Sequence, residues 1–181
     1  MSTIETTRLL LREWRDGDVA PFYAMGQDSR VMEHFPNLWS MEMVTTFIKC
    51  MSVQLLEKNY TLWAVEEKES HQFIGFIGLN CPLWEAHFTP CVEIGWRLAA
   101  FAWGNDYATE GAKAVLDYGF NTLKLEEIVA FTSSANVRSI RVMEKIGMRR
   151  DLKGDFFHPL LEPTHRVAQH ILFRIKHPLV G

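Results

Sequence analysis

The sequence has few cysteines, no long apolar run and little net charge, and each shortage excludes a class of protein. Cys50, Cys81 and Cys91 are odd in number and show no C-x-x-C spacing. We therefore expect buried free thiols rather than a disulfide framework or a zinc site. The net charge of −3 provides no basic surface for nucleic acid. No apolar run approaches the length that spans a bilayer, so we expect neither nucleic acid nor a membrane as a partner.

The two ends of the chain also lack familiar signals. The N-terminal stretch has no apolar core of a secretion signal, so we expect a cytoplasmic protein. Four histidines crowd the C-terminal end without the close pairing that metal sites favour, namely His158, His165, His170 and His177. We expect no metal. With 181 residues, 48% of them hydrophobic, the chain can bury one sizeable core, which predicts a single domain over residues 1–181.

The clearest local pattern lies in residues 91–120, which predict a strand, a tight turn and a helix. Side chains alternate along the strand as its period requires, with Val92, Ile94, Trp96 and Leu98 on one face and Glu93, Gly95 and Arg97 on the other. The helix carries a stripe of mostly small residues, Ala108, Gly111, Ala112, Val115, Leu116 and Gly119. Gly104 in the turn lets the backbone approach a ligand without a Cβ in the way. Free N–H groups at the helix start predict an anion site, and the expected ligand is a phosphate-bearing cofactor.

The turn reads FAWGND and continues as YATE. Neither the dinucleotide motif G-x-G-x-x-G nor the phosphate loop G-x-x-x-x-G-K-[ST] occurs in the chain. The stretch instead resembles the core motif of the GNAT superfamily of acyl-CoA-dependent N-acetyltransferases, in which Q/R-x-x-G-x-G/A cradles the diphosphate of coenzyme A. It is most similar to the branch of ribosomal-protein-alanine N-acetyltransferases, which carries WGxGYATE. Phe101 stands where that pattern has Gln or Arg, and Asp106 stands where it has the second glycine.

Asp106 introduces two opposing effects at the turn. A carboxylate repels a diphosphate, yet an acid in the first helical turn is favoured by the helix dipole, by roughly 0.3–1 kcal/mol. We expect its side chain to point away from the ligand.

The rest of the chain supplies the other elements in the order of the family. Expected strands cover residues 7–14, 61–67, 72–80, 126–133 and 165–175, with helices over 18–26, from Met41 onward and from 137 to 146, and a closing loop over 155–159. Ser40 can cap the second helix, and either Asn136 or Ser134 can cap the last one. Gly75 and Gly78 favour a β-bulge.

A second motif supports the resemblance. Asn136, Ser139, Lys145 and Gly147 are similar to the N-x-x-S-x-x-x-x-x-K-x-G segment that follows the fifth strand of the family. The resemblance covers most of the chain and implies an α+β fold of mixed α/β type. Its central sheet is twisted and mostly antiparallel, is flanked by helices, and is splayed between the fourth and fifth strands.

The resemblance assigns catalytic roles to Glu93 and Ser139. An amine must lose a proton before it can attack a thioester, and the family uses a carboxylate at the position of Glu93 as base. From the residues alone, Glu93 could equally be a solvated strand residue or an ion-pair partner of Arg97. Ser139 corresponds to the serine that serves as acid for the departing thiolate, and its alternative role is a helix serine bonded to a backbone carbonyl.

The resemblance also implies how acetyl-CoA would be held. Leu98 and Ala99 would pair with the pantetheine amides as an added strand would. The turn and helix start would give N–H groups to the diphosphate, through Trp103, Gly104, Asn105, Asp106, Tyr107 and Ala108. Asn136 could contact the cofactor as well as cap its helix.

The expected function is transfer of an acetyl group from acetyl-CoA to a primary amine, which could be a peptide or protein N-terminus, an amino acid or a small molecule. The alternative is a non-catalytic module that binds coenzyme A or a partner protein. The loops that would choose the acceptor carry no readable code. Four aromatic residues, Trp39, Trp84, Phe156 and Phe157, could line a pocket, contact a second copy in a homodimer or pack in the core.

Overall fold

The computed structural model describes residues 3–177 and contains one sheet of eight strands in the order β1-β2-β3-β4-β5-β6-β8-β7. The strands are β1 (Ile4–Glu5), β2 (Leu9–Arg12), β3 (Leu62–Glu67), β4 (Gln72–Asn80), β5 (Glu93–Leu98), β6 (Glu127–Ser133), β7 (Arg149–Phe157) and β8 (Gln169–Lys176). The helices are α1 (Val19–Gln27), α2 (Met41–Lys58), α3 (Tyr107–Asp117) and α4 (Val137–Lys145), with short helical segments η1 (Asp16–Asp18), η2 (Ala100–Ala102) and η3 (Tyr118–Thr122). Among these strands only β5 and β6 pair in parallel. The predicted α+β fold is confirmed.

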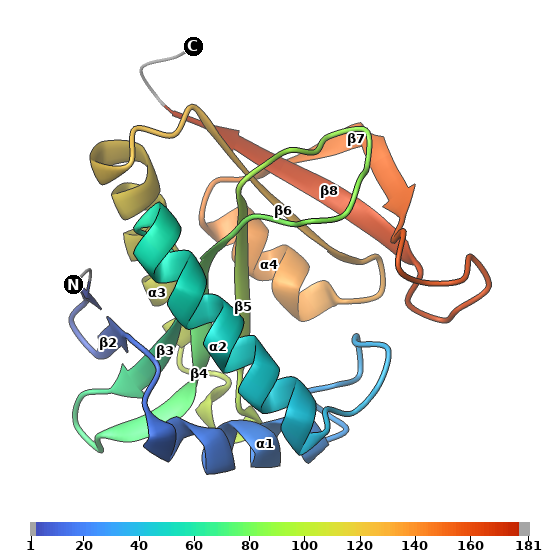
Figure 1. Cartoon of the computed structure of the whole chain (residues 1–181). Coiled ribbons are helices and arrows are strands. Elements are labelled where there is room, and N and C mark those ends of the chain that lie inside the picture. The colour runs from blue at the N-terminus through green and yellow to red at the C-terminus, as the bar shows by residue number, and fades with distance from the viewer. Residues whose placement is uncertain (1–2, 178–181) are drawn as a thin grey trace.

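The helices form a layer on each face of the sheet. Helices α1 and α2 lie on the face turned to the viewer in Figure 1, and α3 and α4 lie behind it. The two faces of the sheet at β4 and β5 lie against different cores. Ile94 and Leu98 of β5 pack with residues of α3 and α4, whereas Phe76 of β4, and Ala99 directly after β5, pack with residues of α1 and α2.

Strands β5 and β6 touch at only one point. Glu93 is in register with Val129, and the Val129 N–H donates to the Val92 carbonyl at 3.0 Å. Beyond this contact the two strands part, which confirms the predicted splay. The predicted fourth and fifth strands are β5 and β6 here, because the short strand β1 was not predicted. Because the pair is parallel, the helices that follow, α3 and α4, both begin at the open end of the gap.

Caps define the starts of two helices. The Met43 N–H donates to the Ser40 hydroxyl at 3.2 Å, so α2 begins where the sequence predicts. The Ser139 N–H donates to the Asn136 side chain at 3.2 Å, which makes Asn136 rather than Ser134 the cap of α4.

A β-bulge interrupts the β3–β4 ladder beside Gly75. The register shifts between Val65 and Glu66, and Gly75 has φ of 134°, a conformation that L residues avoid. The ladder is regular at Gly78, so the second predicted bulge is wrong. There a Cβ would lie 2.0 Å from the Thr61 carbonyl oxygen, so Gly78 permits a close approach of the two strands.

Three further predictions need correction or restriction. The predicted closing loop over residues 155–159 is largely strand, because Asp155 to Phe157 complete β7 at the sheet edge. The many charges of β7 obscured its pattern, and charged side chains are typical of edge strands. Cys50 is exposed rather than buried, and Cys81 and Cys91 are partly exposed; all three are free thiols.

No helix in the described part of the chain is long and apolar enough to cross a membrane.

A buried ion network joins β2 to η1 and to the β3–β4 hairpin. The Arg12 guanidinium donates to both carboxylate oxygens of Asp18, at 2.8 and 2.9 Å, and to Glu66 at 2.8 Å. These residues are only 6%, 3% and 9% exposed. Burial would raise the pKa of Glu66, but hydrogen bonds from Arg12 and His71 outweigh it and lower the pKa. The buried carboxylates of Asp18 and Glu66 therefore depend on the Arg12 guanidinium to remain ionised.

Replacing Arg12 with Met leaves the buried Asp18 without a guanidinium and Glu66 with only Arg15 and His71, each at 3.4 Å. We expect a loss of about 3–5 kcal/mol in the free energy of unfolding, measured with urea. Arg30→Met is the matched control, because Arg30 forms its ion pair with Asp28 at the surface, where it is 70% exposed. The control should change stability little. Equal effects of the two substitutions would contradict the structural role of the network.

Candidate active site

Glu93 lies at the apex of the gap, where β5 and β6 begin to part. Its carboxylate accepts a hydrogen bond of 2.7 Å from the Asn80 side chain at the paired position of β4. Burial raises the pKa of Glu93 to about 7, against the lowering effect of Asn80. The residue keeps a partly exposed edge, so a substrate or water can reach it. A carboxylate with this pKa can take and return a proton near neutral pH.

Glu93 does not pair with Arg97, which removes one alternative for its role. The two side chains share a face of β5, with Gly95 between them. Arg97 instead packs against aromatic rings, with its guanidinium carbon 3.8 Å from the centre of Phe35 and 4.3 Å from that of Trp39. Sequence reasoning missed this contact because Phe35 and Trp39 lie in a distant loop.

The open edge of β5 offers backbone hydrogen-bonding groups to the gap. The Ala99 N–H donates to the Ile74 carbonyl at 2.9 Å and is therefore turned toward β4. Because successive residues of an antiparallel strand face opposite neighbours, Trp96 and Leu98 direct their N–H and C=O groups toward the gap. The Leu98 carbonyl also accepts from the Trp103 indole at 2.9 Å. Of the two residues predicted to pair with pantetheine, Leu98 faces the gap and the Ala99 N–H does not.

The turn before α3 contains two residues in the left-handed region. Gly104 has φ of 82°, and nothing lies within 4 Å of the position that a Cβ would take. Asp106 has φ of 58°, which explains why a glycine is common there and why Asp, which tolerates this conformation, can replace it.

The Asp106 side chain leaves the helix start open. It makes no capping hydrogen bond, and its carboxylate lies 2.6 Å from the Lys145 ammonium of α4. Lys145 lowers the pKa of this carboxyl and offsets its charge. The first N–H groups of α3, including those of Tyr107 and Ala108, have no partner within the helix. They remain available to an anion.

Two arginines flank the same turn. The Arg138 guanidinium lies 4.0 Å from the centre of the Trp103 ring, and Arg8 lies 4.6 Å from that of Tyr107. Arg8 also donates to the Asn105 carbonyl at 2.9 Å. Both cations are paired with carboxylates, Arg8 with Glu110 at 2.6 Å and Arg138 with Glu33 at 3.3 Å. Only their placement by the fold could reveal these contacts.

Ser139 and Asn136 stand across the gap, at the start of α4. The Asn136 amide donates to the Ser139 hydroxyl at 3.1 Å and to Thr132 at 2.9 Å. Since Ser139 uses its oxygen as acceptor here, its hydroxyl hydrogen is free to be donated elsewhere. The alternative of a bond to a backbone carbonyl is not what the structure contains.

Aromatic residues form a second wall beyond Glu93, here called the aromatic wall. Its members pack on one another with ring centres 4.9–6.5 Å apart; they are Trp84, Phe88, Phe131, Phe156, His158 and His170. Burial and, to a smaller extent, the nearby His170 lower the pKa of His158 to about 4, so this imidazole is neutral at pH 7.

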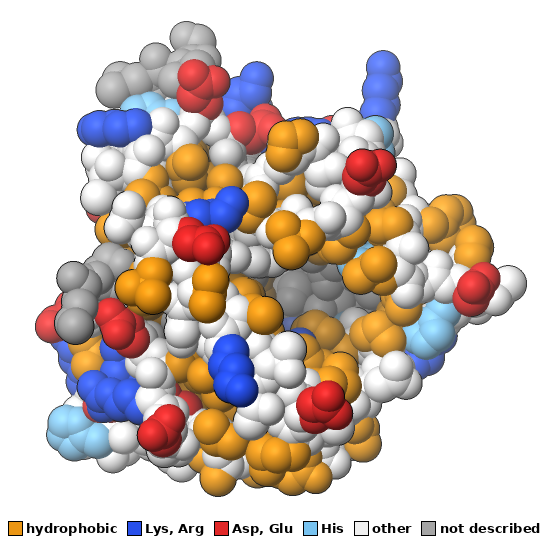
Figure 2. Space-filling view, in the orientation of Figure 1, with side chains coloured by type: hydrophobic (Ala, Val, Ile, Leu, Met, Phe, Trp, Pro, Cys, Tyr) orange, Lys and Arg blue, Asp and Glu red, His pale blue; other side chains and the backbone are white. Residues whose placement is uncertain are grey.

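Figure 2 shows a hollow beside α2, with hydrophobic side chains around it.

The four aromatics singled out from the sequence thus have different places. Trp84 and Phe156 belong to the aromatic wall, and Trp39 packs on Arg97. Phe157 is 57% exposed and lies outside both groups.

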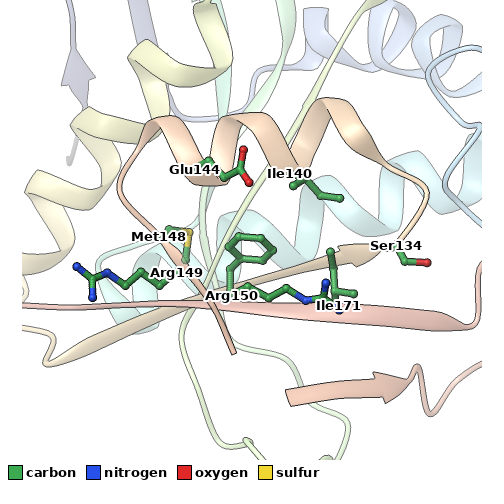
Figure 3. Close-up of a pocket in the computed structure, with 8 residues that line it drawn as sticks. Ser134, Ile140, Glu144, Met148, Arg149, Arg150 and Ile171 are labelled. Atoms are coloured by element: carbon green, nitrogen blue, oxygen red, sulfur yellow. The ribbon is translucent and has the colours of Figure 1, made fainter. Parts of the chain in front are cut away.

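A further pocket lies between α4 and the strands beneath it, and Figure 3 shows Ile140 and Glu144 of α4 above it. Its lining is completed by Ser134, Met148, Arg149, Arg150, Ile171 and Phe173. None of these is a predicted catalytic or cofactor-binding residue. The pocket is distinct from the gap at Glu93.

Two other chemistries lack support in the described residues. Within residues 3–177, no group of three or more His, Cys, Asp or Glu side chains could hold a metal ion. Burial and the neighbouring Glu93 raise the pKa of the Cys91 thiol to about 12, so Cys91 is not an activated nucleophile.

Comparisons with known proteins agree with this geometry. A sequence profile described as an acetyltransferase (GNAT) domain matches residues 8–149. The chain is 36% identical over 146 residues to the uncharacterized protein YkkB of Bacillus subtilis, covering 79% of this chain and 83% of YkkB. The crystal structure of a GNAT-family acetyltransferase from Bacillus anthracis superposes with a TM-score of 0.78 at 28% identity, over 97% and 99% of the two chains.

One more distant structure shares the fold and contains the cofactor. It is RimL, a ribosomal L7/L12 alpha-N-protein acetyltransferase in complex with coenzyme A, with a TM-score of 0.77 at 11% identity over 97% of this chain and 98% of RimL. The chain is also 34% identical to YnaD of Bacillus subtilis, an uncharacterized N-acetyltransferase, over 82% of this chain and 83% of YnaD. Because the profile matches well over half of the chain, this chain belongs to the GNAT family and is an N-acetyltransferase.

Proposed function

We propose that this enzyme transfers an acetyl group from acetyl-CoA to a primary amine by direct attack within a ternary complex, with Glu93 as general base. The observation that carries the proposal is the position of the Glu93 carboxylate, which accepts from the neutral Asn80 at the apex of the gap between β5 and β6. Burial there raises its pKa to about 7. An ammonium group has no lone pair for attack. A neighbouring carboxylate with this pKa removes the proton more effectively than one with the ordinary pKa of about 4.3.

The remaining steps use groups on both sides of the gap. The neutral amine attacks the thioester carbonyl, and the tetrahedral intermediate collapses as its C–S bond breaks. The Ser139 hydroxyl, already held by Asn136, donates its free hydrogen to the departing thiolate. The nitrogen of the intermediate loses its extra proton as the amide forms, and this proton restores the Ser139 hydroxyl, while Glu93 releases the proton it took from the ammonium to solvent. The products are the N-acetylated amine and the free thiol of coenzyme A. Holding both substrates in this gap supplies much of the rate, because orientation removes an entropic cost.

The cofactor grip follows from the open groups of the main chain. We assign the pantetheine arm to the Trp96 and Leu98 edge of β5, and the diphosphate to the turn from Trp103 to Ala108. Coenzyme A in RimL supports this use of the fold. The departures at two turn positions do not oppose it, because Asp106 is paired with Lys145 and the Phe101 side chain is 61% exposed.

Coenzyme A should raise the melting temperature of the purified protein by several degrees, because it binds only the folded state.

Gly104→Ala should weaken the affinity of the protein for coenzyme A by at least about tenfold, equivalent to about 1.4 kcal/mol, because the added Cβ would enter the space assigned to the phosphates. Gly147→Ala is the matched control, since Gly147 has a similar φ of 86° but ends α4. Both substitutions carry a conformational cost of roughly 1–2 kcal/mol. Equal affinities of the two variants for coenzyme A, measured by calorimetry, would refute the assignment of the turn.

Glu93→Gln should fold, bind coenzyme A normally and lose about 10²–10⁴-fold in kcat at pH 7, because the amide cannot accept the proton. Release of free thiol in the presence of acetyl-CoA and a panel of amines provides the assay. The variant should recover relative activity at high pH, where the amine is already neutral. Glu67→Gln is the control, since Glu67 bonds to Ser70 at the β3–β4 turn. Wild-type turnover by Glu93→Gln at neutral pH would show that Glu93 is structural.

A further inference from the structure

Arg97 is a buried cation without a hydrogen-bond acceptor for two of its nitrogens. It is 6% exposed, and its Nε and Nη1 atoms make no hydrogen bond to any of the described residues, 3–177. Arg12 is buried to the same extent, yet Asp18 and Glu66 occupy its guanidinium. A buried charge without a partner is costly. Arg97 therefore has the properties of a ligand-binding group rather than a structural one.

The surroundings of Arg97 favour a planar anion. Its guanidinium carbon lies over three aromatic rings, 3.8 Å from the ring centre of Phe35, 4.3 Å from that of Trp39 and 5.4 Å from that of Phe76. Stacked rings hold the plane of a guanidinium, whereas its hydrogen bonds leave from the edge. Each of the two forks of a guanidinium, Nε with Nη2 and Nη1 with Nη2, matches the two oxygens of a carboxylate.

The position of Arg97 relates the ligand to the reaction. Arg97 and Glu93 project from the same face of β5, and their Cα atoms are separated by four residues, roughly 13 Å of strand. Gly95 lies between them on that face, carries no side chain and is partly exposed. A Cβ at Gly95 would be in van der Waals contact with the Leu62 side chain, at 3.6 Å, which borders this path. A molecule whose amine lies at Glu93 can therefore extend over Gly95 toward Arg97.

We propose that Arg97 binds a carboxylate of the acceptor, so that the acceptor is an amine carrying a carboxylate at its other end, such as an ω-amino acid or a short peptide. This inference rests on the proposed function, because it takes the amine to lie at Glu93. Arg97 then determines specificity without touching the atoms that react.

Matched pairs of acceptors test the proposal. The panel contains α-amino acids, ω-amino acids of increasing length and dipeptides, each beside its C-terminal amide, and thiol release gives kcat/KM. For each pair that the wild-type enzyme acetylates, kcat/KM should be higher for the acid than for its amide. Arg97→Met should lower kcat/KM for the acid by about 30-fold or more, mainly through KM, and leave the amide unchanged. The kcat/KM of Arg97→Lys for the acid should lie between those of the wild type and Arg97→Met, because an ammonium keeps the charge and loses the fork.

Met was chosen because it fills the space among the three rings and removes the buried charge, so the variant should fold. Coenzyme A should shift its melting temperature as it shifts that of the wild type. Loss of that shift, equal use of acids and amides by the wild type, or an equal loss on both by Arg97→Met would each overturn the proposal.

A binding measurement separates this proposal from the proposed function. With coenzyme A present, acids of the panel should raise the melting temperature more than their amides do, and Arg97→Met should abolish the difference. If this difference appears without any acetylation, the proposed function fails and the carboxylate site stands. If amines are acetylated but no acid is favoured in rate or in binding, the carboxylate site fails alone.

Discussion

The single contact between β5 and β6, at Glu93 and Val129, is the constraint on which the rest of the structure depends. Had the ladder continued, the N–H and C=O groups of Trp96 and Leu98 would bond to β6 and no ligand could enter. Because the strands part, these backbone groups have no partner on β6 and lie at an open edge, which proteins usually avoid; the Leu98 carbonyl accepts from the Trp103 indole instead. The helices that follow, α3 and α4, then begin on either side of the gap, with Lys145 and Asp106 joined between them. One missing ladder thus creates a place for a substrate and the walls around it.

Charge burial distinguishes the parts of the chain that support the fold from those that face the gap. Arg12, Asp18 and Glu66 satisfy one another and join three elements. Glu93 is bonded only to the neutral Asn80, and the buried Nε and Nη1 of Arg97 have no acceptor. Both groups lower the stability of the folded chain in the absence of a ligand, as groups selected for function often do.

Local patterns predicted much of the fold, and distant contacts account for what they missed. Alternation in residues 92–98, the turn at Gly104 and the cap at Ser40 each depend on neighbours in the sequence, so strand, turn and helix could be predicted from it. The isolation of Arg97 depends on where rings from a distant loop settle, and the pKa of Glu93 depends on burial that periodicity only suggests. Strand β7 escaped prediction because an edge strand carries charges where a central strand carries apolar residues.

The central claim is that the fold gives the Glu93 carboxyl the proton affinity of a general base. It is tested most directly by following the ¹³C chemical shift of the Glu93 side-chain carboxyl against pH, with Glu93→Gln used to assign the resonance. The account predicts a midpoint near pH 7. A midpoint near the ordinary value of about 4.3 would contradict it, because the carboxylate would then be too weak a base for this role.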